Sequence, residues 1–274
     1  MIIKVLAENN AISEEFITEH GLSLYIETGN NRKILFDVGE TNVFLKNAQK
    51  LNVNLSEIDL VIISHGHVDH GGGLKHFLKE NTKAPIYLHP KALGKYYSKR
   101  PSGNEYIGLV QDFKNNERFI FTTERFFIDK GIEIFSNIPG KALKPSFNKT
   151  LMMEQDGKII QDTFEHEQNL IISEAGKTFL FAGCAHNGIV NITSHFSDLK
   201  KRNADYVFGG FHLYNHSTKR NEDAALIQQI GETLKKTNAK YYTCHCTGLV
   251  SYNLLKTVMT DQIEYLATGR VLKL

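Results

Sequence analysis

The sequence predicts an α/β protein with two stacked sheets and helices on their outer faces. Three observations favour this fold class. Apolar runs of strand length recur in both halves of the chain, and each half closes with segments of helical spacing. Strands and helices alternate through the last third of the chain, which is typical of α/β folds. No linker-like stretch separates the halves, so we expect one domain over residues 1–274.

The first half is predicted from its apolar spacing and its turn residues. Alternating or apolar runs flank the polar turn Gly29-Asn30-Asn31, which indicates a hairpin. In chain order we expect a strand at the N-terminus, a hairpin over 23–39, a helix over 41–51, a strand over 59–64, a helix over about 72–79 and a strand over 84–88.

The second half begins after a segment without clear periodicity. From about residue 91 to 130 the chain is basic, aromatic and interrupted by Gly and Pro, so we expect a surface insertion there. Beyond it we expect strands over 132–136, 151–155, 168–173 and 177–183, a helix over 189–200, a strand over 206–209, a helix over 222–236, a strand over 240–244, a helix near 251 and a last strand at the C-terminus.

Composition bounds the classes of function. The chain has 274 residues and a formal net charge of +2, which gives no argument for binding nucleic acid or a membrane surface. No segment approaches the ~20 consecutive apolar residues of a membrane span, and the N-terminus does not resemble a signal peptide. With three cysteines, no disulfide framework is expected. We therefore expect a soluble, cytoplasmic protein that binds neither nucleic acid nor a membrane.

The stretch Leu60–Gly73, LVIISHGHVDHGGG, places histidines and an aspartate directly after an apolar strand. Imidazole and carboxylate groups are common ligands of zinc and similar cations. His65 and His67 are two residues apart, so in extended backbone they point to the same side and can share an ion. Asp69 and His70 lie where the chain turns into a helix and can face a second ion. The turn therefore predicts a metal site.

The motif HGHVDH resembles the H-x-H-x-D-H signature of the metallo-β-lactamase superfamily, and ILFDVG, residues 34–39, is similar to that family's upstream motif. The resemblance implies a four-layer α/β/β/α sandwich that covers nearly the whole chain. It also implies one or two metal ions and a water molecule activated by metal as the attacking group. By the same resemblance, Asp37 supports a metal ligand from behind and Asp69 orients the attacking group or takes its proton.

Further ligands are expected in later segments. FLFAGCAHNG suggests Cys184 and His186, and YYTCHCTG suggests His245, because the family places ligands at the ends of such strands. Cys244 and Cys246 are interpreted as packing groups or as supports of the ligands, and not as ligands themselves. The family usually shows Pro-Gly-His where this chain has Pro139-Gly140-Lys141, so His186 replaces that ligand, or the first site is weaker, or His166 serves instead. The remaining histidines lack ligand-like neighbours: His20, His76, His89, His195 and His216.

Other residues are candidates for contacts with substrate. His212 in GGFHL can contact substrate or donate a proton. Lys95, Tyr96 and Arg100 lie in the basic, aromatic segment and can hold a phosphate or stack on a flat ring, although a solvated basic surface is the simpler interpretation.

Three functions remain open at this stage. The first is a metal-dependent hydrolase of a small metabolite that carries a phosphate or an ester. The segments GCAHNGIVNI, GGFHL and CHCTG also resemble a subgroup that includes a dihydropterin-diphosphate-dependent transferase of the methanopterin-synthase type. The third is a metal-bound protein without catalytic activity. Imidazole and thiolate donors favour Zn²⁺, with Mn²⁺ or Fe²⁺ as alternatives.

Overall fold

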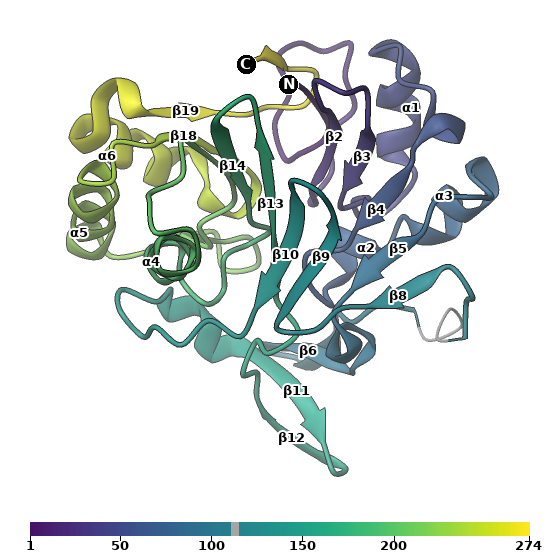
Figure 1. Ribbon diagram of the computed structural model, residues 1–274. Coiled ribbons are helices and arrows are strands. Elements are labelled where there is room, and N and C mark those ends of the chain that lie inside the picture. The colour runs from purple at the N-terminus through teal and green to yellow at the C-terminus, as the bar shows by residue number, and fades with distance from the viewer. Residues whose placement is uncertain (111–114) are drawn as a thin grey trace. The chain divides into compact units, whose positions relative to one another are not determined.

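The computed structural model describes residues 1–110 and 115–274, and Figure 1 shows its strands and helices. The described residues fall into two compact units. Unit 1 comprises Met1–Thr123, Leu151–Gln168 and Leu266–Leu274, and unit 2 comprises Glu124–Thr150 and Asn169–Tyr265. The single domain expected from the sequence stays a prediction, and each unit is described by itself.

Unit 1 is built on a sheet in the order β20-β1-β2-β3-β4-β5-β8. The strands from β20 to β3 pair antiparallel, whereas β3, β4, β5 and β8 pair parallel. The bounds are Ile2–Ala7 (β1), Ser23–Glu27 (β2), Lys33–Phe36 (β3), Leu60–Ile62 (β4), Ile86–Leu88 (β5), Phe119–Phe121 (β8) and Val271–Lys273 (β20). The predicted hairpin over 23–39 is β2–β3, which forms because the polar turn separates two runs with buried apolar side chains.

The helices of unit 1 pack their apolar sides on this sheet. They are α1 (Val43–Lys50), α2 (Val68–Gly71) and α3 (Leu74–Glu80), with 3₁₀ turns at Leu55–Glu57 and Pro90–Leu93. Phe44 of α1 and Phe77 of α3 are fully buried in one cluster with Leu35 and Val61 of the sheet. Asn47 of α1 is also buried, and its amide donates to the carbonyls of Leu6 and Ile17 at 2.8 and 2.7 Å, which ties the helix to the first strand.

The expected insertion over 91–130 is not one segment. Its first part forms β6 (Tyr96–Arg100) and β7 (Gly103–Tyr106), which join β11 (Leu151–Gln155) and β12 (Lys158–Gln161) in a smaller antiparallel sheet, β12-β11-β6-β7. β8, by contrast, belongs to the larger sheet, next to β5. It lies in the stretch that the sequence analysis found to be without clear periodicity, so the sequence pattern did not indicate it. Residues 111–114 of this segment lie outside the described residues.

Unit 2 is built on a sheet in the order β19-β18-β15-β14-β13-β10-β9. Within it, β14, β15, β18 and β19 pair parallel. The bounds are Arg125–Asp129 (β9), Ile132–Ser136 (β10), Gln168–Glu174 (β13), Lys177–Phe181 (β14), Tyr206–Gly209 (β15), Lys240–Thr243 (β18) and Ile263–Tyr265 (β19). A short ladder pairs β16 (Tyr214–Asn215) with β17 (Arg220–Asn221).

The helices of unit 2 are α4 (Ile189–Lys200), α5 (Ala224–Lys235) and α6 (Leu249–Met259), with 3₁₀ turns at Ser146–Thr150, His245–Thr247 and Thr260–Gln262. Helices α5 and α6 lie side by side (Figure 1). Ile192, Ile230 and Leu255, one from each helix, are buried in a cluster with Leu180 and Tyr241 of the sheet. The apolar side chains that recur at helical spacing in the sequence therefore lie on the helix faces that cover this sheet.

Both units thus contain neighbouring parallel strands. Such strands end at a common edge, and the loops that follow their carboxyl ends meet there. In unit 1 the loops after β3, β4 and β5 carry Asp37, His65 and His89. In unit 2 the loops after β14 and β18 carry Cys184 and His245. In the described part of the chain, every helix is too short or too polar to cross a bilayer.

Candidate metal centre

The loop after β4 gathers His65, His67 and His70, all of them buried. The ring centroid of His65 lies 4.6 Å from that of His67 and 4.2 Å from that of His70. Gly66 permits this tight turn, because a Cβ there would stand 2.5 Å from the carbonyl oxygen of Ala92. The three imidazoles that the sequence singled out therefore lie together within unit 1.

Asp37, which follows β3, supports this cluster through hydrogen bonds. Its Oδ2 lies 2.6 Å from His70 Nδ1 and accepts a hydrogen bond from Ser64 Oγ at 2.7 Å, while its Oδ1 accepts one from Ser64 N at 2.7 Å. Ser64 Oγ in turn lies 2.8 Å from His65 Nδ1. The Asp37 side chain is fully buried.

These bonds determine which imidazole nitrogen is protonated. A carboxylate accepts hydrogen bonds, so His70 carries its proton on Nδ1 and donates it to Asp37. The Ser64 hydroxyl donates its hydrogen bond to Asp37, so its oxygen accepts a hydrogen bond from His65 Nδ1–H. Both imidazoles are left with a lone pair on Nε2, and a carboxylate behind a histidine is the usual support of a metal ligand. The residues of unit 1 thus fit a cation.

Asp69 lies at the start of α2 beside other titratable groups. Its Oδ2 is 3.7 Å from His70 Nε2 and 3.4 Å from His20 Nε2. Burial raises the pKa of Glu19 and of Glu40, and the negative charge of Asp69 adds to both shifts. His20 was not singled out from the sequence, because the contact joins residues 49 positions apart along the chain. Asp69 therefore has a polar, partly open setting in which it can exchange a proton.

Asp162 is a residue that sequence reasoning missed. Its buried Oδ2 accepts a hydrogen bond from His166 Nε2 at 3.0 Å and lies 3.7 Å from His67 Nε2. Its Oδ1 accepts from the backbone N–H of Phe164 at 2.7 Å. Burial alone raises the pKa of the Asp162 carboxyl, but His166 and His67 together lower it well below its usual range. The signal in the sequence was the pair Asp162 and His166, four residues apart.

Unit 2 carries its own group of potential ligands. Ligand atoms of Cys184, His186 and His212 lie within 4.8 Å of one another. Cys184 and His186 follow β14, and His212 follows β15. His186 Nδ1 lies 3.1 Å from Asn148 Oδ1, so it donates to the amide oxygen and its lone pair is on Nε2. The thiol and two imidazoles are a donor set that suits zinc.

His245 lies at the start of the 3₁₀ turn after β18, where it is buried. Its neighbour Cys246 accepts a hydrogen bond from the backbone N–H of His212 at 3.3 Å and lies 3.7 Å from the carbonyl oxygen of Cys184. Burial raises the pKa of the Cys246 thiol, but contacts with Cys184 and His212 outweigh it and lower that pKa. The Cys246 sulfur therefore contacts both of the loops that carry ligand candidates after β14 and β15.

Lys141 is exposed, so the Pro-Gly-Lys segment supplies no buried side chain at the position where the family usually places a histidine.

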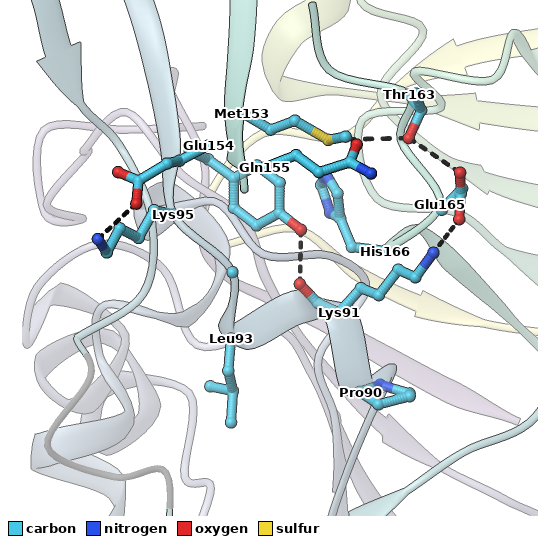
Figure 2. A pocket seen from close by; sticks show the side chains of 12 residues that line it. Pro90, Lys91, Leu93, Lys95, Met153, Glu154, Gln155, Thr163, Glu165 and His166 are labelled. Carbon is cyan, nitrogen blue, oxygen red and sulfur yellow. Dashed lines mark hydrogen bonds and ion pairs between the residues drawn. The ribbon is translucent and has the colours of Figure 1, made fainter. Parts of the chain in front are cut away.

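A pocket of about 390 Å³ opens in unit 1 beside His166. Figure 2 shows Lys95 with Glu154 on one side of it and Lys91 with Glu165 on the other. Its described lining residues include Tyr96 and His166, whose ring centroids lie 4.1 Å apart.

Of the three residues that the sequence suggested as substrate contacts, two line this pocket and one is absent from its described lining. Lys95 and Tyr96 line it, whereas Arg100 is absent from its described lining and pairs with Glu105 at 2.7 Å. The Tyr96 hydroxyl donates to the carbonyl oxygen of Lys91 at 2.5 Å, and burial raises the pKa of Tyr96. Tyr96 is therefore a fixed wall of the pocket.

Comparison with known proteins gives consistent results. The metallo-β-lactamase superfamily profile matches residues 18–234. The chain is 30% identical to 7,8-dihydropterin-6-methyl-4-(β-D-ribofuranosyl)-aminobenzene-5′-phosphate synthase of Methanocaldococcus jannaschii, over 99% of this chain and 96% of the relative. A crystal structure described as a metal-dependent hydrolase of the β-lactamase superfamily aligns with a TM-score of 0.83 and 28% identity, over 100% of this chain and 99% of the other.

Zn²⁺-bound PqqB from Methylobacterium extorquens aligns over the whole of both chains with a TM-score of 0.59 and 16% identity, which bears on the fold alone. These similarities confirm the metallo-β-lactamase fold that the histidine motif predicted. The chain belongs to the metallo-β-lactamase superfamily.

Proposed function

We propose that this protein is a metal-dependent hydrolase of a small metabolite that carries a phosphate or an ester. The observation that carries the proposal is the hydrogen-bond chain from Asp37 through Ser64 to His65, together with the Asp37–His70 contact. It holds two buried imidazoles through their Nδ1 atoms, and a carboxylate behind a histidine is the usual support of a metal ligand.

The proposed metal ligands are the residues that the sequence singled out: His65, His67, Asp69 and His70 in unit 1, and Cys184, His186 and His245 in unit 2. Imidazole and thiolate donors favour zinc. When bound, the metal would lower the pKa of water and polarise the group under attack.

The chain's own residues would perform the remaining tasks. Asp37 and Asn148 orient imidazoles through Nδ1. Asp69 Oδ2 would accept a proton from the attacking group, and the adjacent His20 Nε2 at 3.4 Å can pass it on. His212 would donate a proton to the leaving group.

The pocket beside His166 would bind the part of the substrate that does not react. Its volume is within the range of small-molecule sites. Because Lys91 and Lys95 are each paired with a glutamate, an anionic ligand must compete for them. A substrate with both hydrogen-bond donors and acceptors therefore suits this lining better than a bare phosphate.

A second candidate function is the pterin-type transferase. It is favoured by the 30% identity to the archaeal synthase, which extends over nearly the whole of both chains. Product analysis separates the candidates. Incorporation of ¹⁸O from labelled water into the product marks hydrolysis, whereas release of diphosphate with a new carbon–nitrogen or carbon–carbon bond marks transfer.

Metal analysis tests the proposal at its base. We expect purified protein to contain zinc, and we expect the Cys184→Ala and His186→Ala variants to contain less zinc per chain. Hydrolysis of bis(p-nitrophenyl) phosphate or p-nitrophenyl acetate should stop on chelation and return with added zinc. Protein that binds no transition metal when zinc is supplied would exclude the proposed function.

A further inference from the structure

The pair His67 and Asp162 has the spacing of two ligands of one cation. His67 Nε2 and Asp162 Oδ2 are 3.7 Å apart, which is longer than a hydrogen bond. Two ligand atoms that each lie about 2.0–2.2 Å from a tetrahedral zinc ion stand about 3.3–3.6 Å from each other. The observed separation is therefore within a few tenths of an ångström of that of two atoms that share an ion.

The same spacing recurs at the neighbouring histidine. His70 Nε2 and Asp69 Oδ2 are also 3.7 Å apart, and both of those residues belong to the H-x-H-x-D-H motif. Unit 1 thus contains the same arrangement twice, a buried imidazole facing a carboxylate oxygen. In the second case the carboxylate belongs to Asp162, which lies outside the motif.

His166 is not itself the ligand in this group. The backbone N–H of Gly66 donates to His166 Nδ1 at 2.9 Å, so Nδ1 holds a lone pair and Nε2 holds the proton. Nε2 donates that proton to Asp162 Oδ2 at 3.0 Å. A protonated nitrogen cannot bind a metal, so His166 serves to hold the carboxylate, as hydrogen-bond partners of metal-binding carboxylates commonly do.

The charge of Asp162 supports a cation beside it. The side chain is completely buried, and its ion-pair contacts in the described part of the chain are with His67 and His166 alone. The cost of burying a carboxylate falls when it is paired, and a divalent cation shared with His67 would pair with it.

We propose that Asp162 is a metal ligand, that it binds the same ion as His67, and that His166 orients it. The proposal rests on the metal-dependent function proposed above. It would give unit 1 one more ligand in a chain whose Pro-Gly-Lys segment lacks the histidine that the family usually shows. The preferred cation is zinc, since an imidazole and a carboxylate are both normal zinc ligands at these distances.

Diffraction from crystals of the zinc-loaded full chain, recorded at the zinc absorption edge, tests the assignment directly. We expect an anomalous peak with Asp162 Oδ2 within about 2.2 Å of it. An ion bound by His67 with the Asp162 carboxylate more than about 3 Å away would overturn the inference. This measurement uses the unaltered protein, so it holds even if a variant fails to fold.

Asp162→Asn tests the same assignment in solution, because asparagine keeps the shape but removes the charge. We expect zinc affinity, measured by competition with a chromogenic chelator, to fall by at least about tenfold. The visible absorption of the cobalt(II)-substituted protein should change as well, which a purely structural role would not cause. Asp156→Asn is the matched control, because this exposed residue of the same hairpin has φ 51°, a conformation that asparagine tolerates.

The outcomes separate the two proposals. If the unaltered protein binds zinc but Asp162→Asn matches it in affinity and spectrum, the inference fails and the proposed function stands. If the unaltered protein binds no zinc, both fail.

Discussion

The parallel-strand edges of the two units place ligand candidates in the same way but orient them by different chemistry. In unit 1 a buried carboxylate, Asp37, contacts His70 Nδ1 and Ser64. In unit 2 a neutral amide, Asn148, contacts His186 Nδ1. A carboxylate makes the imidazole it contacts more basic and so a stronger ligand, whereas an amide fixes the ring without adding charge. For the metal ligands proposed above, we therefore expect unit 1 to contribute more to metal affinity than unit 2.

The two units also differ in the kinds of donor atom that they offer to a metal. Unit 1 offers imidazoles and carboxylates, whereas unit 2 offers the Cys184 thiol beside His186. The Cys246 sulfur contacts the loops of both Cys184 and His212. Unit 2 therefore supplies the softer donors, which favour zinc over manganese.

The sharpest test of the comparison removes one imidazole from each unit. His67→Ala should weaken zinc binding by more than about 100-fold, and His186→Ala by about 10–100-fold, because His67 lies beside the Asp162 carboxylate whereas His186 Nδ1 contacts a neutral amide. Zinc affinity is measured by chelator competition at one pH and salt concentration. Equal losses, or a greater loss from His186→Ala, would break the comparison.

The Asp37→Asn variant tests how much the negative charge behind His70 contributes to zinc affinity. The variant keeps an oxygen for Ser64 and His70 but loses the negative charge, so zinc affinity should fall by about 10–100-fold. Asp223→Asn serves as the control, because Asp223 caps α5 through the N–H groups of Ala225 and Leu226 and asparagine caps helices equally well. If Asp37→Asn binds zinc like its control, the carboxylate does not strengthen the site.

Asn148→Ala is the matching change in unit 2 and should have a smaller effect. Removing the amide frees the His186 ring and leaves the His186 carbonyl without the donor at 2.7 Å. Because no charge is lost, we expect zinc affinity to fall by less than about tenfold, with a loss of about 1 kcal/mol in the free energy of unfolding. Asn104→Ala, on the exposed strand β7, is the control. A loss as large as that of Asp37→Asn would contradict the contrast between the units.

The smallest effect is expected in the pocket of unit 1. Lys95→Ala should raise KM up to about fivefold without changing kcat, because exposed charged groups contribute little to binding. The sequence predicts the same for Arg100→Ala, but the structure predicts no change, since Arg100 lies outside the described lining and pairs with Glu105. Steady-state kinetics with bis(p-nitrophenyl) phosphate distinguishes these expectations. An effect of Arg100→Ala equal to that of Lys95→Ala would restore the interpretation from the sequence.

Several features of this protein were determined by the sequence alone. The motif HGHVDH identified the superfamily, and the apolar periods located the longer helices α1, α4, α5 and α6 within a few residues. These signals are local: a metal-binding turn and the exposed and buried faces of a helix are both encoded by neighbouring residues. The short strand β8 was missed because it lies in a stretch without clear periodicity, whereas β4 and β5, also three residues long, lie within longer apolar runs.

Only the tertiary structure decided which distant groups stand behind and beside the imidazoles. Asp37 meets His70 across 33 positions of the chain, Gly66 meets His166 across 100, and Asn148 meets His186 across 38. The Asp37–His70 contact depends on the pairing of the parallel strands β3 and β4, whose carboxyl ends bring separate loops to one edge. His166 and Asn148 reach their partners from segments that do not follow a parallel strand. Asp162 and His166 are four residues apart in the sequence, but only folding brings Asp162 to His67. The hydrogen bonds that decide which ring nitrogen of His65, His70 and His166 carries the proton likewise exist once the chain has folded.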